Sequence, residues 1–314
     1  MQAFKLNRWL EQFRFKLLAM LFTTIILIPN VYAAEPVNRE LVLGSVTIDP
    51  NDRHPELRPI LDYVVGKMAD LGITGGSIKM ARNNDEMLRM LARGEVDWVS
   101  ESLVSALLFN QEADAELFLR RWKDGIAKYH SVIFVREDSE IQTLTDLVGH
   151  TIAFEDSGST SAFYLPALAI VEAGLNLEQL NSPRNDSLPG NVGYVFSRAE
   201  LNTATWVNKN IVSAGGLSHT DWENDNKLPA AFRQDFRIIH ETESVPRTVE
   251  LVKADLEPAI RERLREILLS MHEDPAGRAA LTAYEDSAQF DEFSDAELES
   301  YLRLSDRIKQ LDSQ

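Results

Sequence analysis

A hydroxyl-rich turn between a short apolar strand and an apolar helix is the feature that most constrains the fold of this chain. Residues 151–154 have the composition of a buried strand, and residues 162–171 carry apolar side chains at helical spacing that ends at Gly174. Residues 154–166, at the junction, read Phe-Glu-Asp-Ser-Gly-Ser-Thr-Ser-Ala-Phe-Tyr-Leu-Pro. The pattern predicts a strand that passes through a polar turn directly into a helix.

The chemistry of this turn is that of an oxyanion cradle. The first backbone N–H groups of a helix have no internal partner, and the helix dipole favours negative charge beside them. Ser159, Thr160 and Ser161 add three hydroxyl groups at the same place. A single serine or threonine would be explained as a helix cap, but three hydroxyls after Ser157-Gly158 exceed what a cap requires. We therefore interpret the turn as a candidate ligand site.

The N-terminal residues have the pattern of a cleavable export signal. An apolar run over residues 17–28 is shorter than the roughly 20 residues of a membrane span, so cleavage after Ala33 is favoured over an uncleaved anchor. The basic residues that precede the run are Lys5, Arg8, Arg14 and Lys16. The chain has no cysteine, which excludes a disulfide framework and a lipid-modified cysteine. We expect residues 1–33 to be a signal peptide and the mature protein to be soluble in the periplasm of a Gram-negative bacterium.

The charge balance argues against nucleic acid and anionic membranes as partners. The chain has 32 Lys and Arg against 49 Asp and Glu, a formal charge of −17, and loss of residues 1–33 brings the charge near −20. Nucleic acids and anionic lipids are bound through basic patches. Any anion must therefore be held by local donors against an unfavourable overall field.

Strand and helix patterns alternate along the chain after the signal. Strands are predicted at residues 41–47, 78–81, 96–99, 129–135, 151–154, 210–214 and 236–240. Helices are predicted at residues 59–71, 84–94, 144–147, 162–174 and 199–207, then from residue 256 onward, with a last helix at 296–308. This alternation favours right-handed parallel crossovers in a doubly wound α/β sheet.

Four motifs resemble a known family in their order and spacing. They are Gly94-Glu95-Val96-Asp97-Trp98-Val99 with Glu101-Ser102, then Tyr129-His130-Ser131-Val132-Ile133-Phe134-Val135-Arg136, then Leu144-Thr145-Asp146-Leu147-Val148-Gly149, and lastly Ile152 through Ser161. They are similar to motifs of the phosphate/phosphite/phosphonate-binding proteins of ABC transporters, over nearly the whole mature chain. The Ser-Thr-Ser turn followed by Leu165-Pro166 is the most specific element.

The resemblance implies a type II periplasmic binding protein, an α/β fold in which two lobes close over a ligand cleft. Lobe 1 would hold residues 37–132 and 241–314, and lobe 2 would hold residues 133–240. Such a cleft agrees with the rule that open α/β sheets bind ligands at the carboxyl ends of their strands. The implied function is capture of a phosphonate, phosphite or phosphate for an ABC transporter permease.

Seven residues are candidates for ligand binding. The resemblance carries the oxyanion contacts onto Ser159, Thr160 and Ser161, and it places Ser102 where the family has a first-lobe contact. An ordinary loop serine explains Ser102 equally well. The other three candidates are Tyr129, His130 and Arg198.

Tyr129 and His130 border the expected hinge, although a histidine at a strand edge is more often merely hydrogen-bonded. Arg198 stands beside the position where phosphonate binders carry a histidine, and an arginine there suits an ionised oxyanion. Residues 213–218 lack the aspartate that the family presents at the end of a strand. The organic part of the ligand is therefore left open.

Other functions find less support in the sequence. The turn lacks the Gly-x-Ser-x-Gly pattern of hydrolases, and the six histidines show no paired metal-ligand spacing, so we expect no enzymatic activity, no metal and no cofactor. Two alternatives stay open: a ligand-sensing module for a membrane-bound signalling protein, and a binder of another tetrahedral anion such as a sulfonate. We expect the protein to be a monomer.

Overall fold

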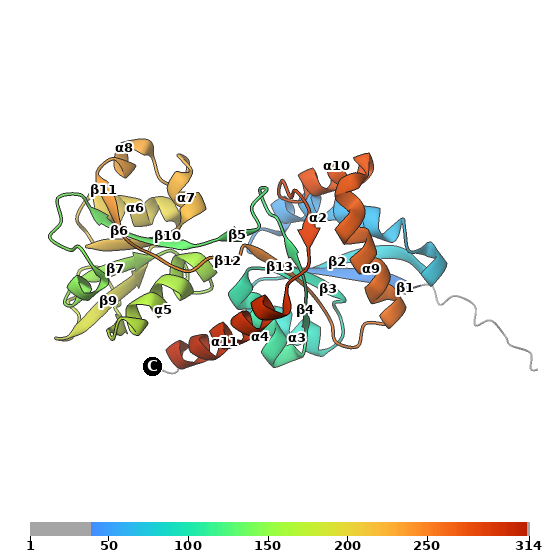
Figure 1. Cartoon of the computed structure of the whole chain (residues 1–314), viewed down its shortest axis with the longest axis horizontal. Coiled ribbons are helices and arrows are strands. Elements are labelled where there is room, and N and C mark those ends of the chain that lie inside the picture. Colours follow the sequence, from blue (N-terminus) through green and yellow to red (C-terminus); the bar gives the residue numbers. More distant parts are fainter. Residues whose placement is uncertain (1–38, 313–314) are drawn as a thin grey trace, which may run out of the picture. The chain divides into compact units, whose positions relative to one another are not determined.

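The computed structural model describes residues 39–312, and these residues form two six-stranded sheets with helices packed against them (Figure 1). The predicted signal peptide lies outside the described residues. A two-stranded ribbon is formed where β5 (Lys128–Tyr129) pairs antiparallel with β12 (Val245–Pro246). The chain thus passes between the two sheets through adjacent segments. Within residues 39–312, no helix combines the length and apolar character needed to span a bilayer.

The first sheet is mixed, in the order β14-β4-β13-β3-β1-β2. β1 runs parallel to β2 and β3, whereas β13 runs antiparallel to β3 and β4. Its strands are β1 (Arg39–Val46), β2 (Ile73–Ala81), β3 (Trp98–Glu101), β4 (Glu116–Arg121), β13 (Thr248–Val252) and β14 (Phe290–Asp291). The accompanying helices are α2 (Pro50–Val65), α3 (Asn84–Ala92), α4 (Leu103–Ala113), α9 (Pro258–Ser270), α10 (Pro275–Ala283) and α11 (Asp295–Asp312), with short 3₁₀ turns at Ala69–Leu71 and Met271–Glu273.

The second sheet has the order β11-β6-β10-β7-β9-β8. β7 runs parallel to β9 and β10, whereas β6 runs antiparallel to β10 and β11. Its strands are β6 (Ser131–Arg136), β7 (Thr151–Phe154), β8 (Asn176–Gln179), β9 (Asn191–Phe196), β10 (Ala214–Ser218) and β11 (Phe236–Glu241). Its helical segments are a 3₁₀ turn at Leu144–Leu147, a π-helix η3 (Thr160–Tyr164), α5 (Leu165–Glu172), α6 (Glu200–Asn208), α7 (His219–Glu223) and α8 (Ala230–Arg233).

Each sheet is buried on both faces. On β6, Ile133 and Val135 pack into one apolar cluster while Val132 and Phe134 pack into another. Successive side chains of a strand point to opposite faces, so the two clusters lie on opposite sides of the sheet. This double burial explains why the strand is a continuous apolar run in the sequence.

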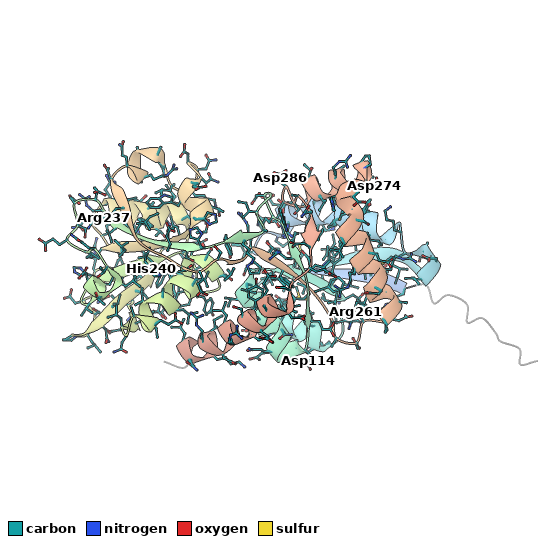
Figure 2. All side chains as sticks on the ribbon, in the orientation of Figure 1. Asp114, Arg237, His240, Arg261, Asp274 and Asp286 are labelled. Atoms are coloured by element: carbon teal, nitrogen blue, oxygen red, sulfur yellow. The ribbon has the colours of Figure 1, made fainter. Side chains whose placement is uncertain are left out.

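A half-buried arginine holds one loop of the second sheet. The guanidinium of Arg237, labelled on β11 in Figure 2, donates to the carbonyl oxygens of Glu137, Ser139 and Ile141, at 2.5 to 2.6 Å. The loop after β6 therefore has its backbone acceptors satisfied without secondary structure.

The predicted elements differ from the observed ones in three instructive places. The helix predicted at 59–71 is α2, which begins at Pro50, where proline is accepted in the first turn, and ends at Val65. Pro55 and Pro59 lie inside this helix, so Pro59 does not mark its start. The strand predicted at 210–214 is β10, at Ala214–Ser218, whose two glycines weaken the strand signal. A Cβ on Gly215 would lie 2.6 Å from the Phe134 ring, so packing requires glycine there. The expected parallel, doubly wound sheet is wrong in detail, because both sheets contain antiparallel strands.

Candidate functional site

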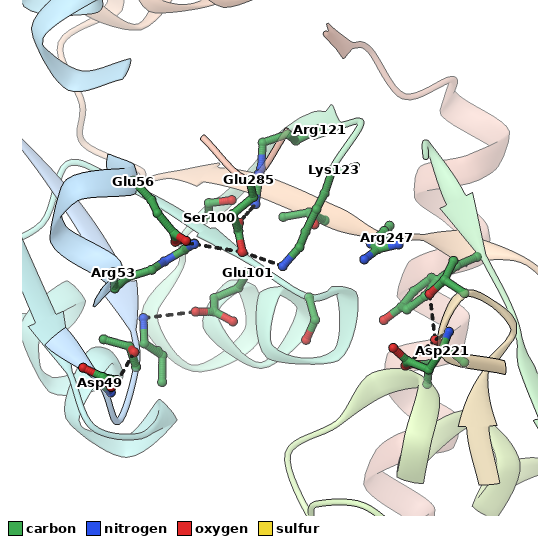
Figure 3. A pocket seen from close by; sticks show the side chains of 18 of the residues that line it. Asp49, Arg53, Glu56, Ser100, Glu101, Arg121, Lys123, Asp221, Arg247 and Glu285 are labelled. Atoms are coloured by element: carbon green, nitrogen blue, oxygen red, sulfur yellow. Dashed lines mark hydrogen bonds and ion pairs between the residues drawn. The ribbon is translucent and has the colours of Figure 1, made fainter. Parts of the chain in front are cut away.

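A polar cavity of about 480 Å³ is lined by residues of both sheets and of the segments that connect them (Figure 3). Ser100, Glu101 and Ser102 reach it at the carboxyl end of β3, and Ser218 reaches it at the carboxyl end of β10. Open α/β sheets bind their ligands at such strand ends. The cavity is therefore the candidate site, and its donors fall into two groups that we call the hydroxyl wall and the cation wall.

The hydroxyl wall consists of Ser102, Tyr129, Thr160 and Ser161. The hydroxyl of Thr160 accepts from the Val104 backbone N–H at 3.0 Å and donates to the Ser102 hydroxyl at 3.1 Å. Thr160 is thus committed to fixing the start of α4, and it positions Ser102 at the cavity. Burial raises the pKa of the Tyr129 phenol, which stays a neutral donor. Ser102, Tyr129 and Ser161 line the cavity directly.

The backbone at this wall is unusual. Thr160–Tyr164 form a π-helix that continues into α5, and π-helical turns are frequent at functional sites. The Ser131 hydroxyl donates to the Ser161 carbonyl at 2.5 Å, so the wide turn has a side-chain partner from β6. The turn is therefore tied to the sheet beside it.

Ser159 has a different environment from the two residues that follow it. Its hydroxyl accepts from the Ala162 backbone N–H at 3.1 Å, which is the geometry of a helix cap. It lines an adjoining cavity of about 790 Å³ instead, together with Arg198. The two cavities share Glu101 and Ser102 in their linings.

The cation wall consists of Glu285 and three basic residues, Arg53, Arg121 and Lys123. Figure 3 shows the three basic side chains converging on the Glu285 carboxylate. The Glu285 carboxylate lies 2.8 Å from Arg53, 2.7 Å from Arg121 and 2.5 Å from Lys123. These cations hold the pKa of Glu285 well below its usual range, in spite of its burial. The wall is therefore a closed ionic cluster.

Behind this cluster lies a fully buried carboxylate. Glu250 on β13 accepts from the Trp98 indole at 2.6 Å and from the Ser100 hydroxyl at 2.7 Å. Its carboxylate is 3.2 Å from the Arg121 guanidinium, which is itself 1% exposed. Arg121 therefore connects the cavity wall to the interior of the first sheet.

Asp221, Glu101 and Arg247 also line the cavity, as do the acidic residues Asp49, Asp52 and Glu56. Burial raises the pKa of Asp221, whose carboxylate accepts from the Ser218 hydroxyl at 2.5 Å. Burial also raises the pKa of Glu101 to about 7, against the hydrogen bond it accepts from the Val46 N–H at 3.1 Å. Arg247, between Lys123 and Asp221 in Figure 3, pairs with Asp124 at 2.6 Å. Glu101 thus has reduced charge near neutral pH.

Four of the seven predicted site residues are absent from the lining of this cavity: Ser159, Thr160, His130 and Arg198. His130 stacks on His219 with ring centroids 4.2 Å apart. The pKa of His130 is lowered mainly by burial and in part by the neighbouring charge of His219. Arg198 has a left-handed backbone (φ 71°) and a side chain that is 72% exposed, 3.7 Å from Asp156. Neither His130 nor Arg198 is part of the hydroxyl wall.

Sequence reasoning missed the residues of the cation wall and Asp221. The cation wall is drawn from α2, the end of β4 and the segment after α10, so no local pattern marks it. Asp221 had a usable signal: Ser218 caps α7 by accepting from the Asp221 N–H at 3.0 Å, and Ser-x-x-Asp is a helix-start pattern. Asp221 lies three residues beyond the end of β10, outside residues 213–218.

Comparison with known proteins identifies the class. Residues 49–300 match the family model described as ABC transporter, phosphonate, periplasmic substrate-binding protein. The chain belongs to this family. Its fold is that of a type II periplasmic binding protein, as the similarity of order and spacing in the sequence predicted.

Solved structures give the same result. XAC2383 from Xanthomonas citri bound to chloride ion is 37% identical with a TM-score of 0.82, covering 87% of this chain and 98% of that one. The same protein bound to ATP matches at 36% identity and a TM-score of 0.82, with the same coverage. PhnD1 from Prochlorococcus marinus in complex with methylphosphonate is 16% identical, with a TM-score of 0.63 over 89% of this chain and 100% of that chain. At this identity the likeness to PhnD1 shows the fold alone.

Proposed function

We propose that this protein captures a phosphorus oxyanion, a phosphonate, phosphite or phosphate, in the cavity between the hydroxyl wall and the cation wall, and delivers it unchanged to an ABC transporter. Membership of the family supplies the transport role. The observation that carries the choice of ligand is the hydroxyl wall, where Ser161, Ser102 and Tyr129 line one cavity at a helix start.

Neutral donors suit an oxyanion in a protein of this charge. Hydrogen bonds from hydroxyl and backbone N–H groups to an ionised acceptor contribute more than bonds between neutral groups. Glu101 and Asp221, whose pKa values are raised, are well suited to share a proton with a partly protonated ligand. Ser102, Tyr129 and Ser161 are thus the residues we assign to the phosphorus group, with Thr160 positioning Ser102.

Three structures of two related proteins support an anionic ligand. XAC2383 holds chloride in one structure and ATP in another, and PhnD1 holds methylphosphonate. A cavity of about 480 Å³ leaves room for a substituent beside the phosphorus group. We further propose that the two sheets mark two lobes, residues 37–132 with 241–314 and residues 133–240, and that the protein acts as a monomer.

Isothermal titration calorimetry with phosphate, phosphite, methylphosphonate and methanesulfonate tests the proposal. We expect at least one phosphorus compound to bind at least tenfold more tightly than the sulfonate. Phosphorus NMR of the released ligand should show it chemically unchanged. Preference for the sulfonate, or turnover of the ligand, would contradict the proposed function.

A further inference from the structure

Glu285 occupies the centre of the cation wall. Its carboxylate contacts Arg53 from α2, Arg121 from the end of β4 and Lys123 from the segment after β4, all within 2.8 Å. All four residues line the cavity, and the Glu285 side chain is 15% exposed. A carboxylate surrounded by two guanidinium groups and an ammonium group is the arrangement in which proteins also hold phosphate oxygens.

A turn with an uncommon backbone conformation positions the Glu285 carboxylate. Glu285 and Asp286 have φ values of 54° and 45°, in the left-handed region that non-glycine residues rarely adopt. The turn is held from both sides, because Arg121 donates to the Tyr284 carbonyl at 3.2 Å and the Asp124 N–H donates to the Glu285 carbonyl at 3.1 Å. The position of the glutamate is therefore fixed before any ligand arrives.

The cation wall has no surplus positive charge. Its three cations face three carboxylates, because Glu56 lies 2.8 Å from Arg53 and Glu250 lies 3.2 Å from Arg121, in addition to Glu285. The lowered pKa of Glu285 keeps it ionised over the accessible pH range. A second ionised group on a ligand would meet a cation wall whose positive charges are already balanced by carboxylates.

Building on the proposed function, we propose that Glu285 is a specificity-determining residue, an internal anion that fills a second oxyanion subsite and so restricts the cavity to ligands with one ionised phosphorus group. Compounds with two such groups would have to displace a carboxylate that is held by three cations. An occupied subsite disfavours ligands with two ionised groups, and it does so without any additional contact to the preferred ligand.

The test uses calorimetry at pH 8 with methylphosphonate and methylenebisphosphonate. We expect the wild type to bind methylphosphonate at least tenfold more tightly than the bisphosphonate. Glu285→Gln keeps the shape of the side chain and removes its charge, so it should reduce this ratio at least tenfold. Glu297→Gln is the matched control, since Glu297 also holds two cations, Arg120 at 2.8 Å and Lys128 at 2.6 Å, but does not line the cavity. It should leave the ratio unchanged.

Two results would overturn the role of Glu285. One is equal or tighter binding of the bisphosphonate by the wild type, a measurement that needs no variant to fold. The other is an unchanged ratio in folded Glu285→Gln. If the wild type binds no phosphorus compound at all, it is the proposed function that fails, so the two failures are distinguishable.

Discussion

The two walls of the cavity present donors in opposite ways. The hydroxyl wall is neutral, and Thr160 and Ser161 come from one short stretch of sequence at the start of a helix. The cation wall is charged, comes from distant parts of the chain, and already has a carboxylate partner for each cation. The number of basic residues that line a cavity therefore does not indicate how much net positive charge the cavity offers to a ligand. The neutral wall is the one we propose for the oxyanion.

Removal of Arg121 should give the largest effect, and it acts on stability. Arg121→Met leaves the buried carboxylate of Glu250 without its cationic partner and removes one of the three cationic partners of Glu285. Loss of one partner of a buried ion pair costs about 3 to 5 kcal/mol. Urea denaturation at pH 7 measures the loss. Arg303→Met is the control, because its side chain is 67% exposed and its removal should cost less than about 0.5 kcal/mol. A loss below 1 kcal/mol for Arg121→Met would mean that the cation wall is not an integral part of the fold.

The hydroxyl wall should behave in the reverse manner. Ser161→Ala removes a donor to a charged ligand, worth about 1.5 to 3 kcal/mol of binding free energy, and should change the free energy of unfolding little. Ser159→Ala removes a helix cap, so it should cost about 1 kcal/mol of stability while methylphosphonate affinity is retained. Calorimetry and urea denaturation on both variants separate the two roles. Equal affinity losses would show that the adjoining cavity also takes part in binding.

Tyr129 should give a smaller change. Tyr129→Phe removes one neutral hydroxyl from the cavity lining, which corresponds to about 0.5 to 1.5 kcal/mol of binding free energy. Calorimetric titration with methylphosphonate should therefore show an affinity several-fold below that of the wild type, with an unchanged thermal midpoint. An affinity equal to that of the wild type would remove Tyr129 from the hydroxyl wall.

A pH dependence set by Glu101 should be of about the same size as the effect of Tyr129→Phe. Its folded-state pKa of about 7 lies above the ordinary value of 4.5, so the folded cavity gains a negative charge as pH rises through 7. That charge disfavours an anion by about threefold to tenfold at the separations of a cavity. The affinity of Glu101→Gln should equal that of the wild type at pH 5.5 and exceed it at pH 8.5. Because ionisation of the ligand is common to both proteins, it cancels in this ratio.

The same residue predicts the direction of a stability change. A carboxyl whose pKa is raised by folding stabilises the protein below its unfolded pKa, and that contribution is lost as pH rises towards the folded value. The wild type should therefore lose stability between about pH 4.5 and 7 relative to Glu101→Gln. Thermal melts across this range provide the check, and parallel profiles would contradict the raised pKa.

The sequence predicted the fold better than the site. The strand at residues 151–154 and the helix beyond Ser161 could be predicted because each depends on a local sequence pattern. The order of the motifs was enough to indicate the family. Ser159 and Ser161 are two positions apart and have the same hydroxyl, yet one caps the helix and the other lines the cavity. The course of the backbone decides which of the two serines lines the cavity, and it cannot be deduced from the residue types.

The cation wall was out of reach for a different reason. Arg53 lies on α2 and Glu285 follows α10, and the packing of α10 against α2 brings the two residues together. In the sequence each of them is one charged residue among many in an acidic chain. Long-range pairing of this kind depends on the whole fold.

A crystal structure of the complex with methylphosphonate tests the central claim most directly. We predict that the phosphonate oxygens lie within hydrogen-bond distance of the Ser161 and Ser102 hydroxyls, with Glu285 still bonded to Arg53, Arg121 and Lys123. A phosphonate bound against Arg53 and Lys123 in place of the Glu285 carboxylate, away from the hydroxyl wall, would contradict the account.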